Sequence, residues 1–461
     1  MSGHPSFVLQ KRLIAIVAIG LFADYFLLSV VIPILPHALH AVGYGEREIG
    51  FLFSAKPGAQ ILCNLIIGPI VDRRGPRVVL LATTLVLAAS TGLFAFGLAQ
   101  THASPSAAYG ICMVARAIQG MASSGIMSGG MALIAENHDE SIHGSAMGMA
   151  VSGIAAGVVL GPPIGGLLAY YSNNLVPFFI VIVVVCMDAL GQVVYNMGQN
   201  GRWFAARNMS MNGGNEGMRV VTSELLRPMS PDSLDESGSV DSPKSCCSSI
   251  SVFSLLSNRR IAVVAMGNLC SNFCVGMMEV ILPLFLIKWY QYSQLAIGLV
   301  FFAMSMSYLV ATPLSGALSD HVNKSKIFGC GLLLAGVGLI SFFWSAHAVI
   351  IWAICSLILT GVGIAFVDTP SMALLSTIAA EDGIEDLGSV FALQDLSVCI
   401  GFMLGPFVGT HLQASAGFQN TCLAAGILLL AYAPSTYFFK SVEVRQGSDY
   451  YPASEVAADG H

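Results

Sequence analysis

Charged side chains are scarce in this sequence. Asp, Glu, Lys and Arg make up 10% of its 461 residues, whereas an ordinary soluble domain has about 25%. Apolar residues make up 55%, and hydrophobic stretches of about 20 residues recur along the whole chain. These features exclude a soluble globular domain and predict an all-α membrane protein that crosses the bilayer many times.

Signals of several other classes of protein are also missing. The eleven cysteines are scattered, with neither a disulfide framework nor the spacing of a zinc site. The net charge of -6 gives no indication of nucleic-acid binding. The first apolar stretch carries an Asp and lacks a cleavage site, so we do not expect a cleaved signal peptide. Without a nucleotide-binding loop or a catalytic constellation, the sequence predicts neither an enzyme nor a cofactor or metal site.

The apolar stretches fall into two groups of six. One long polar segment, residues 198–259, separates the groups and is rich in Ser, Gly and Asn, so we predict a disordered linker there. The chain then divides into an N-terminal six-helix bundle (1–197), the linker, a C-terminal six-helix bundle (260–440) and a tail (441–461). The twelve predicted membrane spans are 12–36, 49–71, 77–98, 108–134, 142–170, 175–197, 260–286, 294–318, 326–346, 348–377, 387–412 and 416–440.

Lys and Arg collect on one side of the predicted membrane. The opposite side carries mainly Arg47 and Lys288. Because short loops rich in Lys and Arg stay in the cytosol, we predict that both termini and the linker are cytosolic. The residues on that side are Lys11, Arg12, Arg73, Arg74, Arg77, Arg202, Arg207, Arg219, Arg227, Lys244, Arg259, Arg260, Lys324 and Lys326.

The two halves repeat short motifs at nearly the same offset. "GPIVDRRGPR" (68–77) follows the second span, and "GALSDHVNKSK" (316–326) follows the eighth. "GVVLGPPIGG" (157–166) lies in the fifth span, and "GFMLGPFVG" (401–409) lies in the eleventh. These markers predict two homologous bundles, which is how major facilitator transporters are built, as parallel repeats about an axis along the membrane normal.

The loop after the second span resembles the signature loop of the major facilitator superfamily. Its pattern is Gly68-x-x-x-Asp72-Arg73-x-Gly75-x-Arg77. We expect Gly68 to permit close helix approach. We expect the charges of Asp72, Arg73 and Arg77 to latch the cytosolic face in one state through ion pairs.

The fifth span resembles the antiporter motif of the proton-exchanging branch of that superfamily. Gly161 and Pro162 lie at the centre of its pattern. Small residues and a Pro kink also suit plain helix packing. Both interpretations stay open.

Ionisable residues inside the apolar spans are the strongest functional signal. Asp24 lies twelve residues after Arg12, the polar edge of the first span. A helical rise of about 1.5 Å per residue places Asp24 roughly 18 Å into a ~30 Å hydrocarbon layer, where a charge faces protein or water and indicates function. Acids outnumber bases five to two, so we predict a cavity that attracts cations. The set is Asp24, Lys56, Arg116, Asp188, Glu279, Asp368 and Asp395.

This set of residues fits an exchanger. A carboxylate in a low-dielectric cavity holds a proton more readily than one in water. Cation binding and protonation then compete for the same group. Asn272 and Glu279 are seven residues apart and therefore share a helix face. Lys56 suits a structural counter-ion and a moving switch equally well, and for Asp188 we expect a structural hydrogen-bonding role.

At these residues the chain resembles the vesicular amine transporter family, which includes the vesicular monoamine and acetylcholine transporters. The family's Asp-containing first helix matches "DYFLLSVVIPILP", its buried lysine lies in "GFLFSAKPGAQILCNLIIGPIVDRRG", and its fourth helix matches "ARAIQGMASS". "NLCSNFCVGMMEVILP" carries its Asn and Glu, and "MSYLVATPLSG" carries a cavity tyrosine. "FVDTPSMALL" and "GSVFALQDLSVCIGFMLGP" carry its two late aspartates. The match covers both halves of the chain.

The chain departs from this family at several positions. Tyr25 stands where the family usually has Asn, and Phe402 stands where the monoamine branch has Tyr. The extra acid of the acetylcholine branch is absent from the fourth span. The substrate therefore stays open, with an amine of monoamine type favoured over choline esters.

The resemblance implies a twelve-helix major facilitator fold with a central cavity between the bundles. It implies proton-coupled antiport of a cationic organic amine into an acidic vesicle by alternating access. We expect a monomer in the lipid bilayer whose partners are the amine and protons. The resemblance implies that Asp24 and Glu279 bind the amine and that Asn272, Tyr308 and Phe402 line the cavity. It implies that Asp368 and Asp395 handle protons, with Lys56 paired to one of them. Arg116 would serve gating or packing.

Three other functions remain open. A broad-specificity drug/proton exchanger shares the fold and the antiporter motif. A polyamine exchanger would suit the several buried acids. A non-transporting receptor or regulator on the same fold would be expected to lose the buried charges, and this chain retains them.

Overall fold

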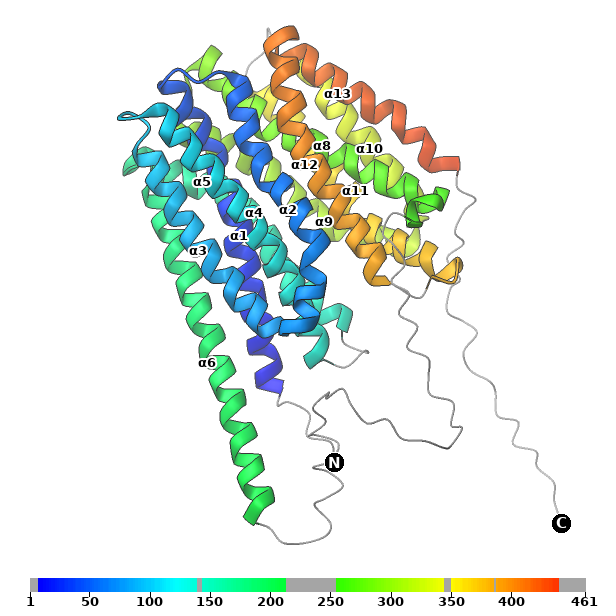
Figure 1. The fold of residues 1–461 in the computed structure, drawn as a ribbon. Helices are drawn as coiled ribbons and strands as arrows, with labels where there is room; N and C mark the ends of the chain where they lie inside the picture. Colours follow the sequence, from blue (N-terminus) through cyan, green and yellow to red (C-terminus); the bar gives the residue numbers. More distant parts are fainter. Residues whose placement is uncertain (1–6, 139–142, 213–253, 344–349, 385–386, 439–461) are drawn as a thin grey trace, which may run out of the picture. The chain divides into compact units, whose positions relative to one another are not determined.

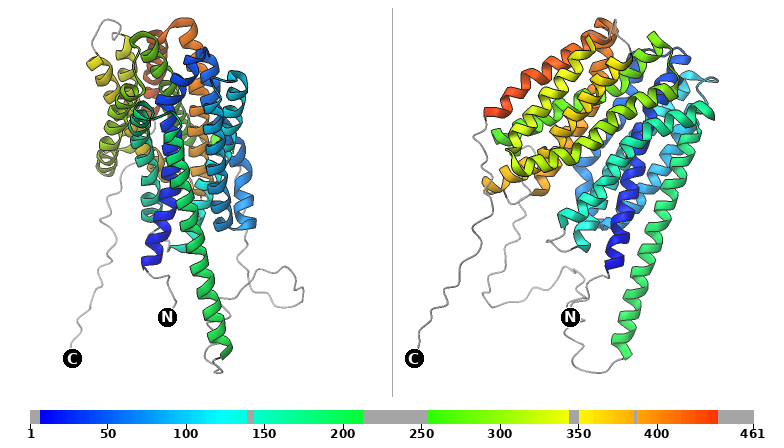
Figure 2. Two further views of the ribbon diagram at one scale, coloured as in Figure 1. Left: turned by 90° about the vertical axis from the view of Figure 1, so that its left-hand side faces the viewer. Right: turned by 180° about the vertical axis from the view of Figure 1, so that it is seen from behind.

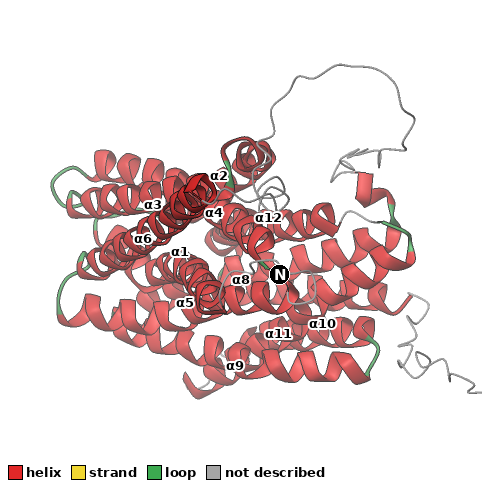
Figure 3. Cartoon of the chain, turned by 90° about the horizontal axis from the view of Figure 1, so that it is seen from below, coloured by secondary structure: helices red, strands yellow, loops and turns green. Residues whose placement is uncertain are grey.

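The chain is built from helices joined by turns. The computed structural model describes residues 7–138, 143–212, 254–343, 350–384 and 387–438. These residues form twelve α-helices and no strand (Figures 1 and 3). The α-helices are α1 (Phe7–Ala41), α2 (Glu46–Arg74), α3 (Pro76–Ala99), α4 (Pro105–Asn137), α5 (His143–Tyr171), α6 (Val176–Asn212), α8 (Arg259–Tyr290), α9 (Gln294–His321), α10 (Lys324–Ser341), α11 (Ile350–Glu381), α12 (Leu387–Ala416) and α13 (Phe418–Tyr432). Two short 3-10 helices are η2 (Ser254–Ser257) and η4 (Ala433–Phe438).

The predicted all-helical membrane fold is confirmed. Ten of the twelve helices are long and apolar enough to cross a membrane. The two others are α13, which has only 15 residues before η4 follows it, and α4. Polar residues inside α4, among them Arg116, Gln119 and Ser123, lower its hydropathy.

Helix α6 extends into the first part of the predicted linker. Helix α6 continues through Asn212, and Figure 2 shows it running past the end of α1. Hydropathy marks where apolar residues end, but a helix makes its own backbone hydrogen bonds and can continue into water. The end of the predicted linker also has structure, because η2 and the start of α8 fall there. The rest of the linker (213–253) and the tail (441–461) lie outside the described residues.

Local residues explain where several helices begin. Gly75, between α2 and α3, has φ 81°, which glycine adopts without strain. Pro76 then begins α3, at a position where the missing N–H is tolerated. In the C-terminal half, the side chains of Asn258, Ser293 and Asn323 each accept a hydrogen bond from a backbone N–H in the first turn of α8, α9 and α10.

The helices pack into two units. Unit 1 comprises Met1–Val31, Gly58–Gly161 and Tyr171–Ile250, and unit 2 comprises Ile32–Pro57, Pro162–Tyr170 and Ser251–His461. Helices α1, α2 and α5 therefore contribute one part to each unit. The predicted division into bundles at 1–197 and 260–440 stays a prediction.

In unit 1, α5 approaches α1 at backbone distance. A Cβ placed on Gly157 would lie 2.7 Å from both the carbonyl oxygen of Phe22 and the backbone nitrogen of Phe26. Gly153, one turn earlier, faces the backbone of Ala18 in the same way. Small residues at such crossings allow the close packing that holds membrane helices together. The α5 glycines therefore fix the part of α1 that carries Asp24.

Unit 2 contains the matching contact between α12 and α8. A Cβ placed on Gly401 would lie 2.8 Å from both the carbonyl oxygen of Leu269 and the backbone nitrogen of Phe273. Gly157 and Gly401 are the first residues of the repeated motif, and each faces a carbonyl and the backbone nitrogen four residues later. The repeat in the sequence therefore corresponds to a repeated packing contact.

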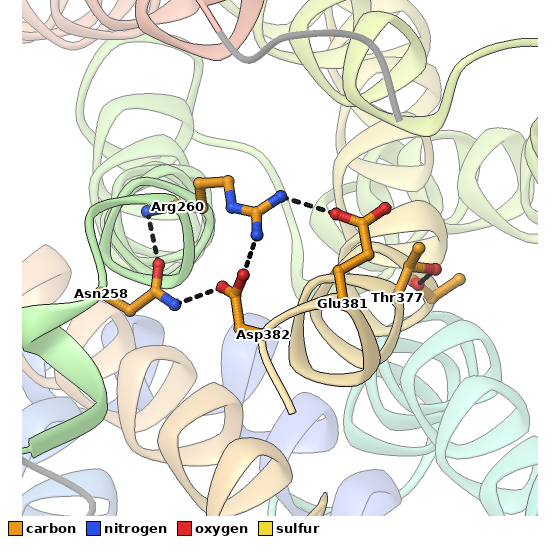
Figure 4. A network of polar contacts seen from close by, with 6 residues as sticks. Asn258, Arg260, Thr377, Glu381 and Asp382 are labelled. Atoms are coloured by element: carbon orange, nitrogen blue, oxygen red, sulfur yellow. Dashed lines mark hydrogen bonds and ion pairs between the residues drawn. The ribbon is translucent and has the colours of Figure 1, made fainter. Parts of the chain in front are cut away.

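A polar network joins the ends of three helices in unit 2 (Figure 4). Arg260, at the start of α8, donates to Glu381 at 2.6 Å and pairs with Asp382, both at the end of α11. Lys324 of α10 donates to Thr377 Oγ1 of α11 at 3.2 Å. These side chains are partly exposed, so each pair contributes little stability, but together they tie α8 and α10 to the end of α11.

We expect Gly157→Ala to destabilise the protein and Gly148→Ala to leave it stable. Both replace a glycine of α5 with the better helix former, worth about 0.5–1 kcal/mol. The added methyl meets backbone atoms only at Gly157, since nothing lies within 4 Å of a Cβ at Gly148. Overpacking should cost Gly157→Ala roughly 1–3 kcal/mol. Thermal unfolding of both purified variants in detergent measures the difference, and equal melting temperatures would contradict the packing contact.

Candidate functional site

Asp24 is the centre of a buried polar cluster in unit 1. It lies on α1 and is 3% exposed. Ser123 Oγ, on α4, donates a hydrogen bond to Asp24 Oδ1 at 2.6 Å. Ser123 Oγ also lies 2.9 Å from the carbonyl oxygen of Gln119. A hydroxyl at this distance stabilises a carboxylate that water cannot reach.

Helix α4 supplies the rest of this cluster. Arg116 is fully buried, and its Nη1 donates to Gln119 Oε1 at 3.3 Å. Arg116, Gln119 and Ser123 are spaced three and four residues apart, so they form one polar stripe on the helix. Of these three residues, Arg116 was predicted from the sequence, and Gln119 and Ser123 were missed. Their helical spacing inside an apolar span was the available signal.

Asp368 is the centre of a second cluster, in unit 2. Tyr308 Oη, on α9, donates to Asp368 Oδ2, on α11, at 3.5 Å. The side-chain amide of Asn272, on α8, lies beside this carboxylate, whose Oδ1 has no hydrogen-bond partner among the described residues. Asn272 Nδ2 donates to the carbonyl oxygen of Asn268 at 2.9 Å. Three helices therefore converge on one half-buried acid.

Other predicted site residues lie on neighbouring parts of unit 2. Glu279 is on α8 with 8% of its surface exposed. Phe402, on α12, packs against Gly276 of α8, where a Cβ would lie 3.1 Å from the Phe402 Cα. Asp395 is half-buried on α12, and Cys399 Sγ lies 3.9 Å from its Oδ2. That Glu279 and Asp24 bind one ligand stays a prediction.

Lys56 is buried in unit 2, beside α12. It is 3% exposed. Ser54 Oγ, two residues earlier on α2, donates to the carbonyl oxygen of Met403 at 2.7 Å. This hydrogen bond places the turn of α2 that carries Lys56 next to Met403 of α12. Which acid pairs with Lys56 stays a prediction.

The expected role of Gly68 is not seen in this conformation. Gly68 is exposed, and a Cβ placed on it would meet no atom within 4 Å. The reason is its position near the end of α2, where no neighbouring backbone passes close to it. That Asp72, Arg73 and Arg77 latch the cytosolic face through ion pairs stays a prediction. In this loop Gly75 has a positive φ, a backbone conformation that favours glycine.

Gly161 and Pro162 contribute to two different contacts. Gly161 faces Ser29 of α1, whose Oγ donates to the carbonyl oxygen of Gly157 at 3.0 Å. The Pro162 carbonyl faces Gly298 of α9 within unit 2. Both are close packing contacts. They support the packing interpretation of the motif and leave its link to antiport a prediction.

The described residues offer no metal site. No group of three or more His, Cys, Asp and Glu in this part of the chain is arranged to hold a metal ion. The two clusters instead combine carboxylates with neutral hydroxyl and amide donors. Such a carboxylate can be neutralised by a proton or by an organic cation.

A family model and several known proteins match the chain over most of its length. The family model described as Major Facilitator Superfamily matches residues 17–195 and 264–455. The chain is similar to the chromaffin granule amine transporter of Homo sapiens, with 27% identity over 417 residues, which is 89% of this chain and 69% of the relative. It is also similar to the synaptic vesicular amine transporter of Mus musculus, with 24% identity over 405 residues, 87% of this chain and 67% of the relative.

A third relative is the probable vesicular acetylcholine transporter-B of Danio rerio. It is 26% identical over 446 residues, which cover 94% of this chain and 80% of the relative. Both branches of the vesicular amine transporter family are therefore among the matches. The resemblance found in the sequence is confirmed.

We expect the contribution of Ser123 to stability to depend on the charge of Asp24. Ser123→Ala removes a donor from a buried carboxylate and should cost about 1–3 kcal/mol. In an Asp24→Asn background the cost should shrink, because a neutral amide needs less compensation. Thermal unfolding of the four proteins in detergent gives the coupling.

The matched control for this cycle is Ser124→Ala. Ser124 is the next residue on α4, and its Oγ donates to Asn64 Oδ1 at 2.5 Å. Ser124→Ala should therefore lower the stability by the same amount in the wild-type and the Asp24→Asn backgrounds. Additive effects of Ser123→Ala and Asp24→Asn would show that the two side chains are not coupled.

Proposed function

The chain belongs to the major facilitator superfamily, and from this premise we propose that it is a proton-coupled antiporter of a cationic organic amine. As a member of a transporter family it is a transporter and not an enzyme. It is a multi-pass membrane protein. In the proposed cycle the amine is loaded into an acidic compartment by alternating access while protons leave.

The observation that carries this proposal is the environment of two acids inside the helix bundles. Ser123 donates a hydrogen bond to Asp24, and Tyr308 donates one to Asp368. A hydroxyl donor orients each carboxylate. A cationic amine and a proton can each neutralise a carboxylate, and the two exclude each other. Competition of this kind is the chemical basis of exchange.

The proposed roles follow the sequence resemblance. Asp24 and Glu279 bind the amine, and Asn272, Tyr308 and Phe402 line its site. Asp368 and Asp395 carry protons, with Lys56 as counter-ion to one of them. The bond between Tyr308 and Asp368 supports a direct link between the substrate site and a proton carrier. Gating is assigned to Gly68, Asp72, Arg73, Arg77, Arg116, Gly161 and Pro162.

The proposed substrate is an amine of monoamine type, and the proposed location is an acidic vesicle. The printed names of the relatives refer to granule and vesicular amine transport, which supports both. The absence of the extra acid in α4 favours monoamines over choline esters. Both termini would face the cytosol, the monomer would be the working unit, and no cofactor would be needed.

Uptake into proteoliposomes with an acidic interior tests the function. The panel contains labelled monoamines, acetylcholine, a polyamine and an unrelated hydrophobic cation. Saturable accumulation of monoamines alone is expected. Preference for the polyamine would favour a polyamine exchanger, and uptake of every hydrophobic cation would favour a drug exchanger. Binding without any accumulation would favour a receptor or regulator.

We expect accumulation to require an inside-acid pH gradient. Protonation of the buried acids on the acidic side releases the amine and lets the protonated carrier return. A protonophore should therefore abolish accumulation, whereas dissipation of a sodium gradient should have no effect. Uptake that follows sodium and ignores pH would contradict proton coupling.

We expect Asp24→Asn to weaken binding of a charged amine roughly ten- to a hundred-fold. The substitution keeps the shape and removes the charge, and a charge-assisted hydrogen bond is worth about 1.5–3 kcal/mol. The amount of folded protein should not fall, because a neutral amide is less costly to bury. Affinity is measured in detergent at matched amounts of folded protein.

Glu136→Gln is the matched control. Glu136 lies exposed near the end of α4, in the same unit as Asp24. Glu136→Gln loses the same charge at an exposed position outside the proposed amine site, so affinity for the amine should be unchanged. An unchanged affinity in Asp24→Asn as well would remove Asp24 from the amine site.

A further inference from the structure

Asp188 is a buried acid that the proposed transport site does not use. It lies on α6, in unit 1, and is 4% exposed. The sequence predicts a structural hydrogen-bonding role for it. Its surroundings allow a more specific assignment, because the hydrogen-bonding state of each of its two carboxylate oxygens is known.

The cluster around Asp188 is short of hydrogen-bond donors. Gln192 Nε2 donates to Asp188 Oδ2 at 2.8 Å and to Thr84 Oγ1, on α3, at 3.0 Å. Thr84 in turn donates to the carbonyl oxygen of Leu80 at 2.8 Å. Within the described part of the chain, Asp188 Oδ1 and Gln192 Oε1 are buried and have no hydrogen-bond partner. Two acceptors are thus left without a donor.

No cation compensates Asp188 among the described residues. It faces α1 at Gly20, where a Cβ would lie 3.2 Å from Asp188 Oδ2, and Ile126 of α4 also lies beside Gly20. The charged residue nearest to Gly20 on α1 is Asp24, one helical turn away.

Other titratable groups on these helices are more distant along the sequence. On α1, Tyr25 lies five residues after Gly20, and Lys11 and Arg12 lie at least eight residues before it. On α3, Arg77 lies seven residues before Thr84. On α4, Arg116 and Glu136 lie ten residues on either side of Ile126, with Cys112, Tyr109 and His138 beyond them; on α6, Tyr195 lies seven residues after Asp188, and Cys186 is exposed. Ten helical residues correspond to about 15 Å.

An ionised carboxylate is unfavourable in this setting. It would be desolvated, would have one amide donor, and would lie near a second acid. A neutral acid removes the charge and supplies the donor that the cluster lacks. Asp24 differs, because a hydroxyl donates to it at 2.6 Å. When two nearby acids have such different surroundings, the less compensated one takes the proton.

We propose that Asp188 is a proton-binding site within unit 1, occupied by a proton in the conformation that the structure describes. The ligand is H⁺, held on a carboxylate oxygen between α1, α3 and α6. The assignment depends on neither the transported substrate nor the direction of transport. It adds a proton site to unit 1, where the proposed function assigns only amine binding and gating.

The test compares the pH dependence of stability in the wild type and Asp188→Asn. An unfolded Asp is ionised above about pH 4, so a folded state that keeps the proton releases it on unfolding. Stability of the wild type should therefore fall relative to Asp188→Asn as pH rises from 5 to 8, by up to tenfold in the unfolding constant per pH unit. Glu136→Gln, at an exposed position, should run parallel to the wild type. Parallel curves for Asp188→Asn would overturn the proposal.

Infrared spectroscopy gives a second measurement on the folded wild type. A protonated carboxyl group has a C=O band distinct from that of a carboxylate. Gln192→Leu removes the amide donor and should shift this band, and Asp188→Asn should remove it. This readout stays decisive if Asp188→Asn does not fold, because Gln192→Leu identifies the band independently. At neutral pH, a protonated-carboxyl band that neither substitution changes, or the absence of any such band, would overturn the proposal.

Discussion

The close backbone contact between α1 and α5, repeated between α8 and α12, is the constraint on which the polar clusters depend. Gly157 and Gly401 leave no room for a side chain at these crossings. Helix α1 carries Asp24, and α8 carries Asn272 and Glu279, so the glycines determine where these groups lie. A displacement of α1 by the width of a methyl group would break the 2.6 Å bond between Ser123 and Asp24. Packing and chemistry are therefore set by the same residues.

The buried acids differ in how their charge is compensated, and this difference separates their chemistry. A serine hydroxyl donates to Asp24, a phenol donates to Asp368, and an amide donates to Asp188. In a low-dielectric interior, small differences in donors decide which acid holds a charge and which holds a proton. A transporter that exchanges a cation for protons needs acids of both kinds.

The sequence predicted the framework better than the details of the site. Membrane spans follow from apolar length, and the repeated glycines follow from spacing, so the helices and the α5 and α12 crossings could be anticipated. Ser123 and Gln119 were missed because an uncharged residue in an apolar span gives a weak signal. The extension of α6 to Asn212 was missed because hydropathy reports where apolar residues end and not where a helix ends. The role of Gly68 depends on which backbone passes beside it, and no sequence pattern contains that information.

The two halves place an acid and a neutral donor on the same pair of helices, with their positions exchanged. In unit 1 the acid, Asp24, is on the first helix of the half and the donor, Ser123, is on the fourth. In unit 2 the acid, Asp368, is on the fourth helix and the amide, Asn272, is on the first. The shared framework brings first and fourth helices together at a buried position, where any polar group needs a partner. The repeat therefore fixes the site of the polar pair, and the choice of acid and donor at each site is what gives each half its own chemistry.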